Sequence, residues 1–216
     1  MKKLSTATLG TLLIWCGTTN LVQAGTVTNQ VADVAGPICV FDASISTGSP
    51  NNGDYVGSVA GNPNKINYFL CIDQVDAVDF VFRVRNSGGK SEYVVETLNG
   101  NPGVVNFTGS NWVGYKFELG YGVGENFVKS GLQDQLSFDT PVRTAAPEPT
   151  SNKFTRLTHG WNTITWFGGV IPPNNQSSPA YFQLSIDVPD NISRFHPDGL
   201  SQFTIRQTPL TRLRSP

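Results

Sequence analysis

The sequence predicts an all-β fold, an antiparallel β-sandwich of jelly-roll or immunoglobulin-like type with about ten strands. Three observations predict it. Clusters of Gly, Pro, Asn and Ser recur roughly every eight to fifteen residues, as turns do between the short strands of a sandwich. Between these clusters, apolar residues tend to occupy alternate positions. No segment sustains the periodicity of an amphipathic helix, and residues 124–131 could hold one helical turn at most.

The alternation is clearest in four segments. In residues 79–85, three apolar side chains share one face of the expected strand and two arginines share the other. Each such segment is expected to bury one face and expose the other, because successive side chains on a strand point to opposite faces. The other three clear segments are residues 115–119, 181–188 and 202–207. Weaker strands are expected at residues 38–41, 66–72, 93–98, 104–107, 136–138, 154–157 and 164–167.

The N-terminus has the form of a secretory signal peptide. A basic start, Lys2-Lys3, precedes an apolar run over residues 4–15, and small residues follow. The run is shorter than the about 20 residues that span a bilayer. We expect residues 1–24 to be removed between Ala24 and Gly25, with no membrane span left after cleavage. The alternative is a buried N-terminal helix.

The expected destination is secreted, extracellular or periplasmic. A bacterial lipoprotein signal is an alternative, in which Cys16 would be lipidated, although Trp15 is larger than the residue this processing prefers. Residues 25–209 are expected to form a single sandwich domain, since sandwiches often reach this length. Residues 210–216 are expected to be a disordered tail.

Two cysteines follow the expected cleavage site, Cys39 and Cys71. An exported protein passes through an oxidising compartment, so a Cys39–Cys71 disulfide is predicted, with two buried free thiols as the alternative. A cysteine-ligated zinc site is not expected from these residues. Lys and Arg number 15 against 16 Asp and Glu, and no stretch is densely basic. This composition disfavours nucleic acid as a partner.

The two histidines, His159 and His196, lie in predicted turns and are expected to be solvated. The sequence has no HExxH pattern and no GxSxG nucleophile elbow. A pairing of His196 with Asp198 offers fewer ligands than a structural zinc needs. We therefore expect no catalytic, metal or cofactor site.

The acidic residues give no convergent set in the sequence. Asp73, Asp76 and Asp79 are three positions apart, which on a strand places neighbours on opposite faces. Glu118 and Asp187 lie on outward faces of predicted strands, but a glycosidase needs two carboxylates about 5–10 Å apart across a cleft. A calcium loop at residues 51–54 is an alternative, although its sequence lacks most of the usual ligands.

Aromatic residues are the best candidates for binding. An exposed, flat aromatic ring on an exported sandwich can stack on a sugar, whereas most large rings fill the core. Trp112 and Trp166 are expected in the core, the latter because it alternates with Ile164. Trp161 stands at a strand start and is the candidate for glycan stacking, with burial in the core as the alternative.

Four segments occur in an order that resembles bacterial exported proteins of the PEP-CTERM and choice-of-anchor type. They are residues 112–122, 164–169, 184–190 and 203–209, and the resemblance covers residues 91–209. Those families join a β-sandwich ectodomain to a C-terminal sorting tail and are linked to extracellular polysaccharide and biofilm matrix. Here residues 210–216 contain no apolar helix, and Pro147-Glu148-Pro149 lies mid-chain in a polar context. The resemblance implies a released protein or one whose tail was lost.

Three functions follow from these observations. The first is a non-catalytic exported protein of the cell envelope or extracellular matrix, with a structural or binding role and extracellular polysaccharide or other envelope components as partners. The second is a lectin-like carbohydrate-binding module. The third is a hydrolase with a dispersed site.

Overall fold

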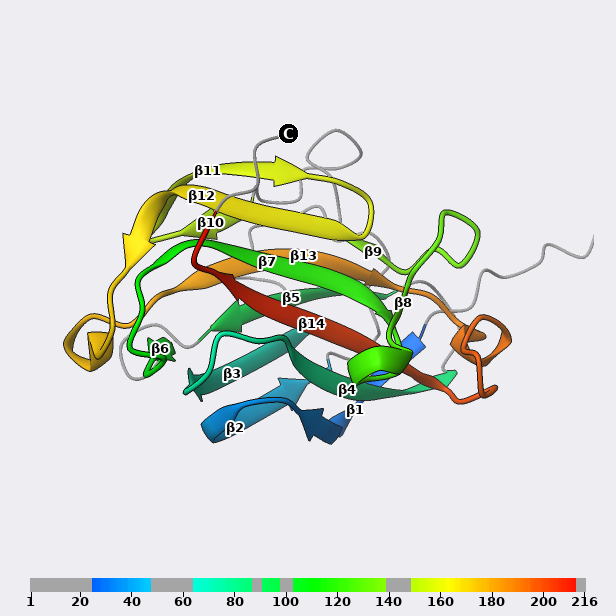
Figure 1. Cartoon of the computed structure of the whole chain (residues 1–216). Helices are drawn as coiled ribbons and strands as arrows, with labels where there is room; N and C mark the ends of the chain where they lie inside the picture. Colours follow the sequence, from blue (N-terminus) through cyan, green and yellow to red (C-terminus); the bar gives the residue numbers. More distant parts are fainter. Residues whose placement is uncertain (1–24, 48–63, 87–90, 98–102, 139–148, 213–216) are drawn as a thin grey trace, which may run out of the picture.

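Two packed β-sheets form the protein (Figure 1). The computed structural model describes residues 25–47, 64–86, 91–97, 103–138 and 149–212, and all structural statements refer to these residues. The expected signal peptide, Cys16, residues 51–54 and Pro147-Glu148 lie outside the described residues. The sandwich predicted from the sequence is confirmed.

The first sheet has the strand order β1-β4-β14-β7-β12-β11, with β8 beside β7. All of its pairs are antiparallel. Its strands are β1 (Gly25–Ala35), β4 (Val78–Asn86), β14 (Gln202–Leu210), β7 (Trp112–Tyr121), β12 (Thr163–Ile171), β11 (Phe154–His159) and β8 (Val128–Lys129).

The second sheet has the order β10-β13-β5-β3-β2, with β6 beside β3 and β9 beside β13. It is mixed rather than purely antiparallel, because β3 runs parallel to both β5 and β6. Its strands are β10 (Thr150–Ser151), β13 (Phe182–Val188), β5 (Ser91–Thr97), β3 (Lys65–Ile72), β2 (Ile38–Ser46), β6 (Val104–Asn106) and β9 (Ser137–Phe138). Three-residue 3-10 helices occur at η2 (Gly124–Asn126), η3 (Asn175–Ser177) and η4 (Ile192–Arg194).

The fourteen strands of the described residues exceed the about ten expected from turn spacing. The longest strand that the sequence did not indicate is β1. Its pairing with β4 has register irregularities between Val27 and Val31 and between Val31 and Asp33. A bulge inserts an extra residue and breaks the period-two pattern, so the alternation that revealed the other long strands is missing here.

Aromatic side chains fill the space between the sheets. Phe182 of the second sheet stacks on Tyr115 of the first, with ring centroids 4.8 Å apart, and Phe117 and Trp166 also contact it. Trp112 and Trp166 are both buried, as predicted. Rings of this size dominate core energetics because each one removes a large apolar area from water.

Several strands are buried on both faces, contrary to the expectation that each would expose one. In β5 the side chains of Ser91 and Glu92 are as buried as that of Tyr93. For β7 the structure gives a reason: β8 pairs with Gly120 and Tyr121, and the ring of Phe127, just before β8, lies against the outer face at Gly120. A Cβ on Gly120 would lie 2.2 Å from the Val128 carbonyl oxygen, so only glycine allows this close approach.

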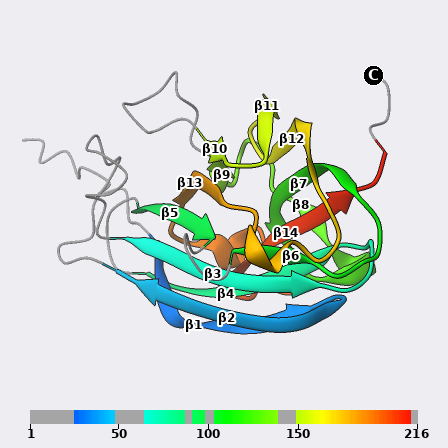
Figure 2. The same ribbon diagram turned by 90° about the vertical axis from the view of Figure 1, so that its left-hand side faces the viewer.

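One long edge of the sandwich is closed by consecutive strands. β1 belongs to the first sheet and β2 to the second, and the turn at Gly36-Pro37 joins them, so the two strands lie side by side (Figure 2). The Val27 amide donates a 2.9 Å hydrogen bond to the hydroxyl of Tyr93, which links β1 to the second sheet. The Cys39–Cys71 disulfide, predicted from the sequence, then joins β2 to β3.

Candidate functional site

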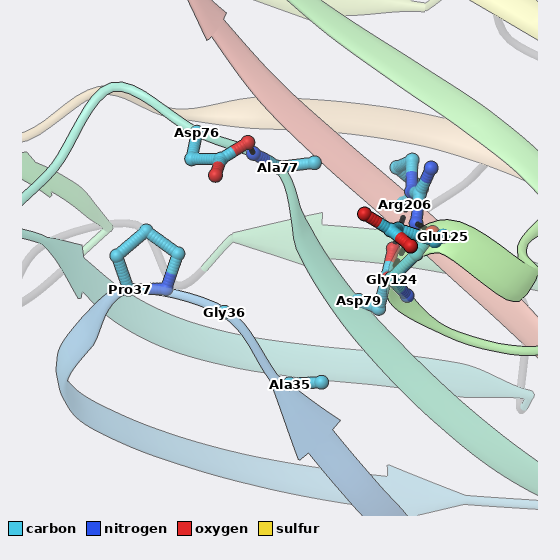
Figure 3. A pocket seen from close by; sticks show the side chains of 9 residues that line it. All are labelled: Ala35, Gly36, Pro37, Asp76, Ala77, Asp79, Gly124, Glu125 and Arg206. Carbon is cyan, nitrogen blue, oxygen red and sulfur yellow. Dashed lines mark hydrogen bonds and ion pairs between the residues drawn. The ribbon is translucent and has the colours of Figure 1, made fainter.

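A pocket of about 430 Å³ opens where the β1–β2 turn, the start of β4 and η2 meet (Figure 3). It lies on the outer side of the first sheet, since Phe80 and Phe82 of β4 point into the core and Asp79 therefore points outward. Its lining comprises Ala35, Gly36, Pro37, Asp76, Ala77, Asp79, Gly124, Glu125 and Arg206. The pocket combines a small apolar wall with charged groups.

A partly buried ion pair forms the base of this pocket. Asp79 and Arg206 are cross-strand partners on β4 and β14. Arg206 donates from Nε to Oδ1 of Asp79 at 2.6 Å and from its terminal nitrogen to Oδ2 at 2.7 Å. The Asp79 side chain is only 3% exposed. This bidentate geometry fixes both side chains, because the guanidinium presents two parallel N–H groups to the two carboxylate oxygens.

η2 is fastened to the same pair. The Gly124 amide donates a 2.7 Å hydrogen bond to Oδ2 of Asp79, and the Gly124 carbonyl accepts one from Arg206. The Arg206 guanidinium also lies 4.0 Å from the centroid of the Phe127 ring, a cation–π contact. The Arg206 guanidinium thus neutralises Asp79 and contacts η2 through Gly124 and Phe127, which holds η2 in a fixed place beside the pocket.

The opposite wall is set by a close backbone approach. Gly36 has a φ of +122°, and a Cβ there would lie 2.5 Å from the Ala77 carbonyl oxygen. Glycine alone is compatible with that conformation and that contact. The β1–β2 turn therefore packs directly against the residues that precede β4, and the pocket has a rigid rim on this side.

Two exposed carboxylates stand at the rim, Asp76 and Glu125. Asp76 accepts a 2.7 Å hydrogen bond from the Ala77 amide through Oδ1. Asp79 and Arg206 cancel one another, so the rim acids leave the lining with a negative charge excess. Sequence reasoning missed this site. It assigned Asp76 and Asp79 to opposite faces of one strand, but β4 begins at Val78, and Asp76 lies in the preceding turn.

A second charged cluster occupies the same outer face. Glu118 is the cross-strand neighbour of Arg206 on β7, and it accepts contacts from Lys116 at 2.7 Å and Lys129 at 2.5 Å. Burial acts to raise the pKa of the Glu118 carboxyl, but hydrogen bonds from the two lysines and their charges lower it below its ordinary value. This cluster fastens β8 to β7 and is saturated by its own partners.

Glu118 and Asp187 do not form a carboxylate pair. Phe117 and Ile186, their chain neighbours, both point into the core, so Glu118 and Asp187 lie on the outer faces of opposite sheets. Asp187 is buried and accepts a 3.4 Å hydrogen bond from Ser137. The two carboxylates that glycoside hydrolysis would need are therefore separated by the whole sandwich.

The expectation that His196 is solvated is wrong. The residue is 7% exposed, its ring packs edge-on against Tyr121, and its Nδ1 accepts a hydrogen bond from the Asp198 amide. Burial lowers the pKa of His196, opposed by the nearby Asp198 charge. The His196 amide donates a 3.1 Å hydrogen bond to the Ile192 carbonyl, so the chain turns back after η4, and the ring lies beside Tyr121 at the end of β7.

His159 and Trp161 lie at the β11–β12 hairpin, both partly buried. The Trp161 carbonyl accepts a 2.8 Å hydrogen bond from the Phe138 amide, which ties the hairpin to β9. No cluster of three or more His, Cys, Asp or Glu suited to a metal ion is found among the described residues. In the same part of the chain, no helix has the length and apolar character needed to cross a membrane.

Comparison with known proteins finds no family model that matches the chain, and no match among curated proteins or solved structures. The likeness to PEP-CTERM and choice-of-anchor proteins therefore stays a prediction.

Proposed function

We propose that this chain is a non-catalytic protein exported to the cell envelope or extracellular matrix, where it acts by binding. The disulfide between β2 and β3 supports passage through an oxidising compartment. A two-sheet scaffold with an aromatic core supports a rigid presenting role rather than one that depends on large movements. Extracellular polysaccharide and other envelope components are the proposed partners.

The observation that carries the binding role is the pocket between the β1–β2 turn and η2. Its charged base is held by the Asp79–Arg206 pair and by Gly124, and its far wall is held by Gly36. A site whose groups are already fixed loses little entropy when a ligand binds. A pre-formed concave site with a few oriented polar groups is the usual form of a small-ligand site.

Export is tested by expressing the full chain, with its own N-terminus, in a bacterial host and fractionating the cells. We expect the product in the periplasm or medium, with an intact mass that corresponds to residues 25–216 less two hydrogens for the disulfide. A membrane-bound product with added acyl mass would indicate lipidation at Cys16. Cytoplasmic protein that retains Met1 would contradict the proposal.

Binding is tested by co-sedimentation with a panel of insoluble extracellular polysaccharides and by a glycan array. Paired variants place the site: Asp76→Asn with Glu125→Gln reports on the pocket, and Trp161→Ala reports on aromatic stacking at the β11–β12 hairpin. Loss of binding in the Trp161 variant alone would select the lectin-like alternative. Turnover in a screen of glycoside, ester and peptide substrates would refute the non-catalytic assignment.

A further inference from the structure

The pocket carries an uncompensated negative charge. Three carboxylates line it, from Asp76, Asp79 and Glu125, against one guanidinium from Arg206. The Arg206 charge is neutralised by Asp79, and Arg206 also contacts the Gly124 carbonyl and the Phe127 ring. An incoming ligand therefore meets the charges of Asp76 and Glu125.

The surroundings strengthen this field. Ala35, Pro37 and Ala77 line the pocket with apolar groups, each only partly exposed. A cleft with low-dielectric walls and a net charge of one sign focuses the potential and concentrates ions of the opposite sign. A volume of about 430 Å³ also falls within the range of sites that hold small organic ligands.

These observations select the charge of the ligand. An anionic group would be repelled by both rim carboxylates, and the charge of Arg206 is already neutralised by its bidentate pair with Asp79. An ammonium group would replace water at carboxylates that stand ready to accept its hydrogen bonds. The methylene or ring carbons beside the nitrogen would rest on the Ala and Pro wall.

We propose that this pocket binds a ligand that carries an ammonium group, with an amino sugar and a polyamine as the two sources of that chemistry. The inference rests on the proposed binding role and specifies its ligand class. The rim acids supply the attraction, and the fixed Asp79–Arg206–Gly124 base supplies the shape.

Calorimetric titration of the whole disulfide-bonded protein tests the proposal. The probes are a glucosamine tetramer, its fully N-acetylated counterpart and spermidine. The N-acetylated tetramer keeps the sugar but lacks the ammonium charge, and spermidine carries ammonium charge without a sugar. We expect the glucosamine tetramer or spermidine to bind and the N-acetylated tetramer to bind at least tenfold more weakly. Binding should weaken between about 0.05 and 0.5 M salt, because exposed charges are screened over this range.

The variant for the test is Asp76→Asn with Glu125→Gln. Both side chains are exposed, and Asn keeps the oxygen that accepts from the Ala77 amide, so the fold is retained. Loss of two exposed charge contacts should raise the dissociation constant roughly 2- to 30-fold. Asp42→Asn, an exposed acid on β2 outside the pocket, is the matched control and should leave binding unchanged.

The outcomes divide cleanly. Binding of the glucosamine tetramer alone assigns an amino sugar, binding of spermidine alone assigns a polyamine, and binding of both assigns recognition of the ammonium group itself. Equal binding of the N-acetylated tetramer, no effect of the rim variant, or no binding of either amine overturns the inference. If neither amine binds, the polysaccharide panel still tests the proposed binding function separately.

Discussion

Removing the disulfide is the perturbation whose cost can be worked out most directly from this structure. Cys39 and Cys71 lie on neighbouring strands, with Cα atoms 5.4 Å apart and a sequence separation of 32 residues. Cys39 falls at the register irregularity between Ile38 and Val40, where β2 lacks regular pairing with β3. The bridge therefore secures an edge strand at its weakest paired point.

The magnitude follows from loop entropy. A bridge that closes a loop of this length removes about 12.4 cal/mol/K from the unfolded chain, which is about 3.7 kcal/mol at 25 °C. The double variant Cys39→Ala with Cys71→Ala should lose that stability. For a urea m value of about 2 kcal/mol/M, the unfolding midpoint falls by about 1.9 M. The melting temperature falls by about 7–15 °C for a domain of this size.

The assay is urea unfolding of the double variant, the oxidised protein and the reduced protein, followed by tryptophan fluorescence. Trp112 and Trp166 are buried and report on the core. The reduced protein controls for side-chain changes, since its sequence is unaltered, and it should match the variant. A stability loss below about 1 kcal/mol would refute the loop-entropy reasoning, because the unfolded chain would then gain little freedom from the missing bridge.

Three further predictions follow. Glu118→Gln should destabilise the protein at pH 7, because the lowered pKa of this carboxyl stabilises the fold fully above the unfolded value of about 4.3. The stability difference from wild type should vanish as the pH falls through the lowered pKa of the folded state. Denaturant titrations from pH 7 to 3 measure the difference, and a constant difference would contradict the prediction. His196→Asn should flatten the fall in stability below about pH 6.5, since a lowered histidine pKa makes protonation favour the unfolded chain; an unchanged pH slope would oppose this. Gly120→Ala should lower the free energy of unfolding by about 1–3 kcal/mol, because the added methyl group clashes with the Val128 carbonyl. Gly131→Ala, where a Cβ meets nothing within 4 Å, is the control and should leave the stability unchanged in the same assay. Equal stability of the two variants would show that β8 shifts to accommodate the methyl group.

The local sequence pattern was sufficient for most of the long strands. In β4 and β14, Val84 and Phe203 alternate with charged or polar residues, and both strands appear where expected. The same pattern failed for β1, whose register irregularities interrupt the alternation. It also failed for the outer face of β7, where Glu118 reads as exposed but is covered by the returning chain and its two lysines.

The candidate site was beyond the reach of sequence reasoning for a different reason. Asp79 and Arg206 are 127 residues apart in the chain, and only the pairing of β4 with β14 makes them neighbours. Glu125 joins them because η2 is fastened to Asp79 by the Gly124 amide. None of these residues belongs to a motif with a fixed spacing, so no local signal marks the pocket.

The sequence by itself determined the class of fold, because the alternation of apolar residues is a local property of each strand. It also determined the cysteine pairing, because only two cysteines follow the expected cleavage site. Tertiary structure alone decided the mixed pairing of the second sheet, the burial of His196 and the grouping of charges around Asp79 and Arg206. Those features depend on contacts between residues far apart in the chain, and their geometry is set by how the two sheets pack and by where the turns return.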